Sequence, residues 1–266
     1  ITENFTLKPR ISNRYNEDDY RYFRNDLSRA RSEHFSNAFS TELHGIYTTK
    51  FGNFGLGWES RWEQIESSNL GEHKRNNHGA YAEYRFTIAQ KLFVNAGAYA
   101  NYNSVYGWQV FPGVDLAYQI HSNLNFGVNV GSSQRIPSFT DLYLNQRPGN
   151  IGNPDLKSEN ALQYEAILKY NKKSWLGQVG YFHRNITNFI DWVRQDSTVP
   201  YQPFNLGEVQ MQGWHAQIKN TFKIATNKSI NLGISYYYLQ PENLERDSNS
   251  TSKYVVENLK HQVIAL

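Results

Sequence analysis

The chain has 266 residues, no cysteine, 15% aromatic residues and a net charge of only +3. The absence of cysteine excludes disulfides and thiolate metal sites, and the scattered lysines and arginines argue against a dedicated nucleic-acid surface. No apolar run reaches about 18 residues, which excludes a transmembrane helix but leaves a transmembrane β-barrel open, because barrel strands are apolar on one side only. The chain begins with Ile and carries no signal peptide, so we expect it to be a piece of a longer protein.

Apolar and polar residues alternate with a period of two through most of the chain, and this pattern predicts β-strands. In the most regular segment, residues 124–131, leucine, phenylalanine and valine alternate with asparagine and glycine. Twelve strands are predicted, near residues 5–12, 35–48, 54–66, 79–88, 92–102, 110–120, 124–131, 162–170, 175–186, 208–222, 229–239 and 254–266.

The predicted connections between these strands alternate strictly between long and short. Short turns are expected near 49–53, 89–91, 121–123, 171–174 and 223–228. Long loops are expected near 15–34, 67–78, 103–109, 135–158, 187–207 and 240–253. Bacterial outer-membrane barrels have short periplasmic turns and long extracellular loops, whereas a soluble sandwich or propeller gives no reason for such alternation. Strands of about 10 residues also fit a tilted crossing of the bilayer.

Each predicted strand has one apolar face and one polar face, but alternation alone does not tell which face meets solvent. Two features favour a membrane barrel with its apolar face outward. The apolar faces contain many small residues that would underfill a large core, namely Ala80, Ala82, Ala96, Ala98 and Ala100. Tyrosine and tryptophan recur near strand ends, as in interfacial aromatic belts: Tyr84, Tyr102, Trp108, Tyr118, Tyr170, Trp175 and Tyr236. The polar faces carry charges that we expect to line the lumen, namely Glu59, Arg61, Glu63, Glu83 and Arg85.

One stretch, from Gln134 to Glu159, interrupts the alternation with Q-R-I-P-S-F-T-D-L-Y, a polar middle and G-N-P-D-L-K-S-E. Its distinctive residues are Arg135, Pro137, Phe139, Asp141, Leu142, Tyr143, Gly152, Asn153, Pro154, Leu156, Lys157 and Glu159. The combination resembles the mid-barrel signature of TonB-dependent outer-membrane receptors, in the branch of the vitamin B12 and ferric-siderophore transporters. The resemblance extends to L-G-E-H-K-R at 70–75, to 107–118, to Asn205-Leu206-Gly207 and to Gly213. His215 departs from the family pattern, which usually has an acidic residue two positions after that glycine.

The resemblance implies a barrel of about 22 strands whose lumen holds an N-terminal plug. Residues 1–266 would then be part of the receptor's β-barrel domain, with the plug domain and the C-terminal strands outside this chain. It also implies uptake of a scarce, bulky nutrient such as a corrinoid or a ferric siderophore. The implied partners are outer-membrane lipids, the receptor's own plug, the inner-membrane TonB complex and the large nutrient ligand. No cofactor, catalytic residue or nucleic-acid partner is expected.

Several side chains are candidates for a functional site, each with a structural alternative. Arg135 and Asp141 would contact ligand or plug, or would fix the strand-to-loop transition by hydrogen bonding, which we favour. Four residues in expected extracellular loops suit a large planar ligand, with loop packing or interfacial anchoring as the slightly favoured alternative: Tyr143, Arg147, Trp192 and Arg194. Asp18 and Asp19 would suit Ca²⁺, although adjacent acids in a polar loop are usually solvated. The histidines show no metal-ligand spacing.

Three classes of function remain, and an energised receptor-transporter is favoured. A passive porin or adhesin barrel has the same strand pattern but needs neither plug nor TonB. An outer-membrane barrel enzyme needs a clustered Ser/His/Asp set or paired acids near one rim. Ser138 and Asp141 lie close in the sequence, but no histidine accompanies them at a recognisable spacing.

Overall fold

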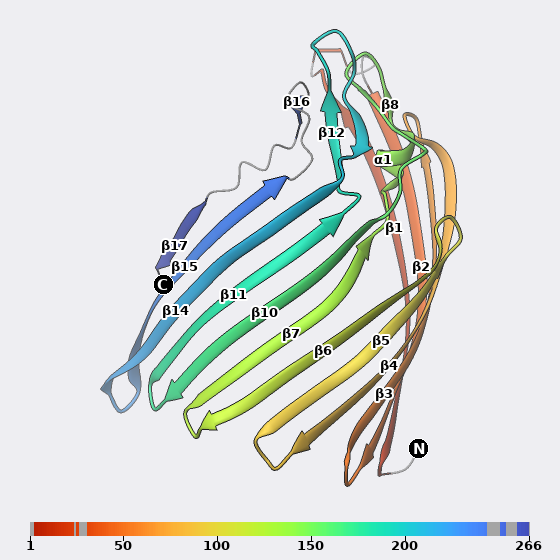
Figure 1. Ribbon diagram of the computed structural model, residues 1–266. Helices are drawn as coiled ribbons and strands as arrows, with labels where there is room; N and C mark the ends of the chain where they lie inside the picture. Colours follow the sequence, from red (N-terminus) through yellow and green to blue (C-terminus); the bar gives the residue numbers. More distant parts are fainter. Residues whose placement is uncertain (1–2, 24, 27–30, 244–250, 254–259, 266) are drawn as a thin grey trace.

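A computed structural model describes residues 3–23, 25–26, 31–243, 251–253 and 260–265 (Figure 1). These residues form one curved antiparallel sheet of twelve strands in which each strand pairs with the next along the chain. The strands are β1 (Phe5–Arg21), β2 (Arg31–Thr49), β3 (Gly52–Ser67), β4 (Gly71–Ile88), β5 (Leu92–Asn103), β6 (Gly107–His121), β7 (Leu124–Arg135), β10 (Glu159–Lys172), β11 (Trp175–Thr187), β14 (Glu208–Ala225), β15 (Lys228–Asn243) and β17 (His261–Ala265). The predicted all-β segment of twelve antiparallel strands is confirmed. Within the described residues the sheet stays open, with β1 and β17 as its edges.

Small elements gather at one end of the sheet, at the top of Figure 1. They are α1 (Phe139–Tyr143), β8 (Asn145–Gln146), β9 (Asn150–Ile151), β12 (Ile190–Arg194), β13 (Gln202–Asn205) and β16 (Thr251–Ser252). β13, β12 and β16 form a three-stranded sheet, and β8 pairs with β9. No helix in the described part of the chain is long and apolar enough to cross a membrane.

The short turns lie together at the opposite end, as predicted. The chain reverses at 50–51, 89–91, 122–123, 173–174 and 226–227. At 89–91, Ala89 and Gln90 have φ values of 48° and 57°. Two successive left-handed residues give the backbone twist that matches tight turns to the right-handed twist of paired strands.

Three of the predicted long loops are wrong. β1 and β2 continue through most of 15–34, and the chain reverses within three residues at 68–70 and again at 104–106. The backbone ladder runs on through these polar segments, for example with Glu66 opposite Glu72. Alternation disappears there because polar side chains occupy both faces of the hairpins, not because the strands end. Of the predicted loop 240–253 and strand 254–266, residues 244–250, 254–259 and 266 lie outside the described residues.

The register sorts apolar and polar side chains onto opposite faces of the sheet. One row across β2–β6 joins Leu43, Trp58, Ala80, Ala100 and Val110. Large apolar side chains on this face are exposed, with Leu56 at 61% and Trp108 at 73%. Soluble proteins rarely expose so large a continuous apolar surface, so this face requires an apolar covering.

The opposite face carries the charged side chains. Arg61 pairs with Glu63 at 2.7 Å, and Arg85 pairs with Glu83 at 2.9 Å. His215, at the position where the family pattern has an acid, also lies on this face. Its ring covers the bare backbone of Gly180, and its Nδ1 lies 4.0 Å from Glu165 Oε1. The polar wall is therefore lined by paired charges.

Candidate functional site

The candidate site begins where β7 ends and the chain turns into α1. Pro137 is fully buried, and Ser138 caps the helix. Ser138 Oγ accepts a hydrogen bond from the backbone N–H of Asp141 at 3.1 Å, and Asp141 Oδ2 accepts one from the backbone N–H of Ser138 at 3.0 Å. This reciprocal capping box fixes a one-turn helix that was not predicted from the sequence, although Ser-x-x-Asp is a form of its signal.

Two buried carboxylates converge on Arg135 and tie the motif together. Glu159 forms a bidentate pair with Arg135, with both N···O distances at 2.8 Å, and Asp141 Oδ2 lies 3.4 Å from the same guanidinium. Hydrogen bonding to Glu159 raises the pKa of Arg135. The two carboxylates accept further hydrogen bonds from β12. Trp192 Nε1 donates to Asp141 Oδ1 at 3.0 Å, and the Ile190 N–H donates to Glu159 Oε1 at 2.7 Å. One network thus joins β7, α1, β10 and β12.

A small hydrophobic core lies beneath this network. It consists of the buried side chains of Leu142, Leu156 and Ile190, with Tyr143 packed against it. The three buried residues come from α1, from the segment before β10 and from β12, so the core forms only when the loops fold onto one another. We call the structure made by 135–159 and 188–207 the loop assembly.

Asparagines join the two halves of the loop assembly. Asn153 Nδ2 donates to the carbonyl of Pro203 at 3.0 Å, and its Oδ1 accepts from the N–H of Asp155, which closes the turn at the exposed Pro154. Asn205 Oδ1 accepts from the N–H of Lys157 at 2.9 Å, and its Nδ2 donates back to the Lys157 carbonyl. Backbone groups that no strand pairs are thereby satisfied.

Gly152 lies where two backbone segments nearly touch. Its N–H donates to the Leu144 carbonyl at 2.6 Å, and a Cβ there would lie 2.6 Å from the carbonyl carbon of Leu142. A side chain at this position therefore requires backbone movement.

Gly152→Ala is expected to destabilise the loop assembly by about 1–3 kcal/mol, because the added methyl overlaps backbone atoms. Hydrogen exchange of α1 and β12 in the complete protein measures the effect. Gly149→Ala in the same loop is the matched control, since its nearest neighbour would lie 3.7 Å away. Equal exchange in the two variants would contradict the expectation.

The other side of α1 packs on the β3–β4 hairpin. The ring of Tyr143 stacks on His73 with centroids 3.5 Å apart, and the Arg75 guanidinium lies 4.5 Å from the centroid of Phe139. Arg75 also donates to the carbonyl of Pro137 at 2.9 Å. His73 and Arg75 belong to the L-G-E-H-K-R segment at 70–75, so that segment positions the motif.

The β5–β6 turn lies against the same region through Tyr106. Burial raises the pKa of Tyr106 to about 12, and the neighbouring Tyr143 and Asp141 act in the same direction. Both hairpins that had been predicted as loops therefore support α1.

The outermost part of the loop assembly is a cluster of cations and aromatic rings. Arg194 lies 4.4 Å from the ring centroid of Tyr201, and Lys253 lies 5.4 Å from the Trp192 ring and 5.8 Å from the Tyr201 ring. Lys253 Nζ also donates to Asn150 Oδ1 at 2.9 Å. Cations at these distances are attracted by the negative ring faces. Beside the cluster is an open cavity of about 520 Å³ between β12 and β13, lined by Val193, Arg194, Gln195, Val199, Pro200, Gln202, Phe204, Asn205 and Leu206.

The four predicted ligand residues occupy different environments. Trp192 is only 6% exposed and donates to Asp141, so its side chain lies inside the loop assembly. Arg194 reaches the cavity, Tyr143 stacks on β4, and Arg147 is exposed in the β8–β9 hairpin. The structure brings Trp192 and Arg194 together, and it adds Tyr201 and Lys253, which no sequence signal marked.

Asp19, one of the two acids considered for Ca²⁺, is neutralised by arginines. Arg21 and Arg31 both donate to its carboxylate and hold its pKa well below the usual range. Over the described ranges of the chain, no group of three histidine, aspartate or glutamate side chains is arranged to hold a metal ion.

Comparisons with known proteins agree on one family. Residues 2–263 match the family model described as "TonB dependent receptor-like, beta-barrel". The vitamin B12 transporter BtuB of Photobacterium profundum is 28% identical over 224 residues, which are 78% of this chain and 35% of that protein. The chain thus spans about a third of this curated relative.

Solved structures show the same fold. The copper transporter OprC superposes with a TM-score of 0.75 at 13% identity, over 92% of this chain and 45% of that one. The siderophore receptor PirA from Pseudomonas aeruginosa superposes with a TM-score of 0.66 at 13% identity, over 91% of this chain and 52% of that one.

Proposed function

This chain belongs to the TonB-dependent receptor β-barrel family, and we propose that it forms twelve strands in the wall of an outer-membrane receptor that actively takes up a scarce, bulky nutrient. The observation that carries the proposal is the family match over residues 2–263. The family consists of transport receptors in outer-membrane β-barrels. The exposed apolar face supports the same role, and so does the position of five tight turns at one end of the sheet and of the long connections 136–158 and 188–207 at the other.

Residues 1–266 constitute part of the barrel domain in this proposal, and the plug and the remaining strands come from outside them. Unpaired edge strands invite pairing with other chains, so natural sheets cover or pair them. The two open edges of the described sheet, β1 and β17, support this arrangement, since further strands would pair with both. The paired charges of the polar wall would then face the plug.

The end with the short turns faces the periplasm, and the loop assembly faces the outside. The nutrient binds in the cavity beside Arg194 and the cation–aromatic cluster, with Tyr143 and Arg147 as further contacts. Aromatic rings supply contact area at low entropic cost, and the cations favour an anionic ligand. A corrinoid and a ferric siderophore are the candidate ligands, as the resemblance to BtuB and the fold of PirA suggest. Energy from the inner-membrane TonB complex moves the plug, and no bond is broken.

Uptake of radiolabelled cobalamin and of ⁵⁵Fe-siderophores by cells carrying the complete receptor tests this function. We expect accumulation of one ligand class, and we expect it to stop when TonB is deleted. Accumulation that continues without TonB would support a passive porin instead. Turnover of a substrate without accumulation would support a barrel enzyme.

Arg194→Ala is expected to weaken ligand binding about tenfold, the equivalent of 1.4 kcal/mol, because it removes a cation at the cavity. Ligand titration of the purified complete receptor gives the Kd. Lys223→Ala is the control, since Lys223 is an exposed cation beside the 226–227 turn, at the opposite end of the sheet from the cavity. A normal Kd in Arg194→Ala would remove this cavity from the proposed site.

A further inference from the structure

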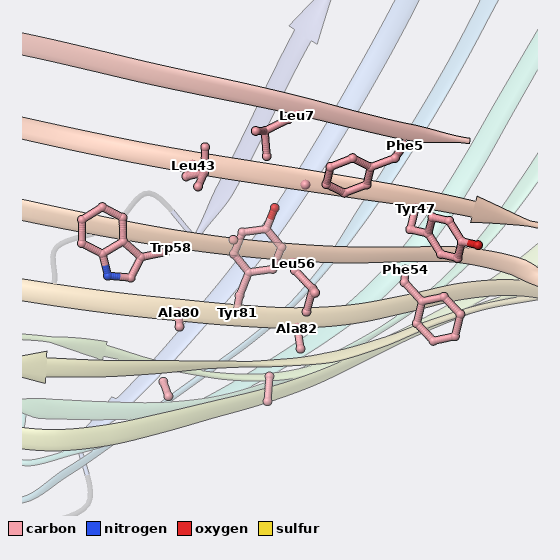
Figure 2. A pocket seen from close by; sticks show the side chains of 14 residues that line it. Phe5, Leu7, Leu43, Tyr47, Phe54, Leu56, Trp58, Ala80, Tyr81 and Ala82 are labelled. Atoms are coloured by element: carbon pink, nitrogen blue, oxygen red, sulfur yellow. The ribbon is translucent and has the colours of Figure 1, made fainter. Parts of the chain in front are cut away.

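The outward face of the sheet has a hollow across β1–β5 (Figure 2). Its floor consists of four alanines on the neighbouring strands β4 and β5, namely Ala80, Ala82, Ala98 and Ala100, and of Gly45 on β2, beyond Leu56 of β3. Ala82 lies directly opposite Ala98, and Ala80 opposite Ala100. Larger side chains, including Leu7, Leu43 and Trp58, stand around this floor. The hollow measures about 610 Å³ and is lined almost entirely by apolar atoms.

Aromatic rings border the hollow on the side of the 50–51 turn. Phe54 lines the hollow and stacks on Tyr84, with centroids 4.2 Å apart. Tyr84 Oη donates to the carbonyl of Phe51 at 3.0 Å. Lys50 follows in the turn itself, with Nζ 4.9 Å from the Phe51 ring centroid. The order along the strand is thus apolar hollow, aromatic ring and cation, which is the order of a membrane interface.

The short turns at the end of the sheet around Lys50 are basic, although the exposed Glu3 lies at the same end. The short-turn segments 49–53, 89–91, 121–123, 171–174 and 223–228 contain six lysines and neither aspartate nor glutamate, the lysines being Lys50, Lys91, Lys172, Lys173, Lys223 and Lys228. All six are exposed. We call them the lysine rim. A net charge of +3 for the whole chain therefore conceals a strongly cationic end.

We propose that the hollow and the part of the lysine rim beside it, Lys50 and Lys91, together form a binding site for an anionic phospholipid. One acyl chain lies on the floor of small residues, and the phosphate meets Lys50 beyond Phe54 and Tyr84. Basic residues at a membrane surface bind anionic headgroups, and apolar area that an acyl chain covers adds to the affinity. This site lies on the outside of the wall, so it is separate from nutrient binding. The inference rests on the membrane location in the proposed function, and its test does not use uptake.

A phospholipid fits the site better than a protein partner does. A second copy in the same membrane would have the same orientation and would bring its own lysine rim to the same level, where like charges repel. The hollow also offers almost no polar atoms to orient a partner helix. Lys50, and Lys91 in the turn that joins β4 to β5, carry the positive charge that complements a phosphate at this end of the hollow.

The test uses the complete receptor in vesicles of phosphatidylcholine that contain increasing fractions of brominated phosphatidylglycerol or brominated phosphatidylcholine. Bromine quenches tryptophan on contact, and the signal of Trp58 is the difference between the native protein and Trp58→Phe. We expect half-maximal quenching at a fraction of phosphatidylglycerol about fivefold lower than that of phosphatidylcholine. Lys50→Gln should lower this preference for phosphatidylglycerol about fivefold, since one lysine at the membrane surface contributes about 1 kcal/mol.

A second variant tests the hollow itself. Ala82→Leu combined with Ala98→Leu fills the floor and should abolish the preference, whereas Ala216→Leu, on the outward face of β14, should retain it. Retention of the SDS-resistant folded form verifies that each variant is folded. Equal quenching by the two lipids, or an unchanged preference in Lys50→Gln, would overturn the proposal. A native mass of two receptors with no bound phospholipid would assign the hollow to a second copy instead.

Discussion

Asp141→Ala is expected to unfold the loop assembly while the twelve-stranded sheet stays intact. The carboxylate is 8% exposed and accepts hydrogen bonds from the Ser138 N–H, the Ser138 hydroxyl and the Trp192 indole. Alanine leaves those donors and the Arg135 guanidinium without their acceptor, and we estimate a cost of about 3 kcal/mol or more. Hydrogen exchange and limited proteolysis of the complete receptor would show early opening of 135–159 and 188–207.

Two further variants separate the carboxylate's charge from its shape. Asp141→Asn keeps one acceptor oxygen, so it should lose less stability than alanine. Asp155 is an exposed acid in the same loop, and its side chain makes none of these contacts. The Asp155→Ala variant should therefore be as stable as the native protein. Native protection of both segments in Asp141→Ala would show that the network does not hold the loops.

Trp192→Ala and Tyr143→Ala are expected to lower nutrient uptake about tenfold or more without impairing outer-membrane insertion. Trp192 is a buried anchor, and its removal leaves a cavity that costs about 3–5 kcal/mol and releases Tyr201 and Arg194 from their positions. Tyr143→Ala removes the ring that stacks on His73 and loosens α1 from β4. Radiolabelled uptake by whole cells, normalised to receptor in the outer membrane, measures both effects.

Conservative variants show whether shape or chemistry matters at these positions. Trp192→Phe retains most of the volume but loses the hydrogen bond to Asp141, so uptake should fall between native and alanine. Tyr143→Phe retains the stacked ring and should transport almost normally. Native uptake in both alanine variants would remove the loop assembly from the nutrient site.

The hairpins β3–β4 and β5–β6 show where reasoning from alternation stops. Their apolar halves were predicted within a few residues, because one face there meets an apolar phase and the other meets water. Their polar ends were predicted as the loops 67–78 and 103–109, yet the ladder continues to Gly71 and Asn103. Backbone hydrogen bonds maintain a strand whose two faces are both polar, and no periodicity of apolar residues reports them.

The candidate site shows the same division between local and distant information. The motif at 134–159 was evident from residue order, and the capping Ser138 and Asp141 are only three residues apart. The partners of the motif are not local, since Trp192 reaches Asp141 across 51 residues and Asn150 meets Lys253 across 103. The sequence left ligand contact and loop packing open for Trp192, with packing slightly favoured, and its side chain is enclosed by the loop assembly.

Residue order alone predicted twelve antiparallel strands, five tight turns at one end, and an apolar and a polar face along the regular segments. These features depend on neighbours one or two residues away, and a period of two records them directly. The tertiary structure was needed to show which predicted loops are strands, which aromatic side chains are buried, and that small residues of β2, β4 and β5 form a hollow on the side of the sheet near Lys50. Those properties arise when strands distant in the sequence are set in register, and residue order does not record how close two distant residues lie in space.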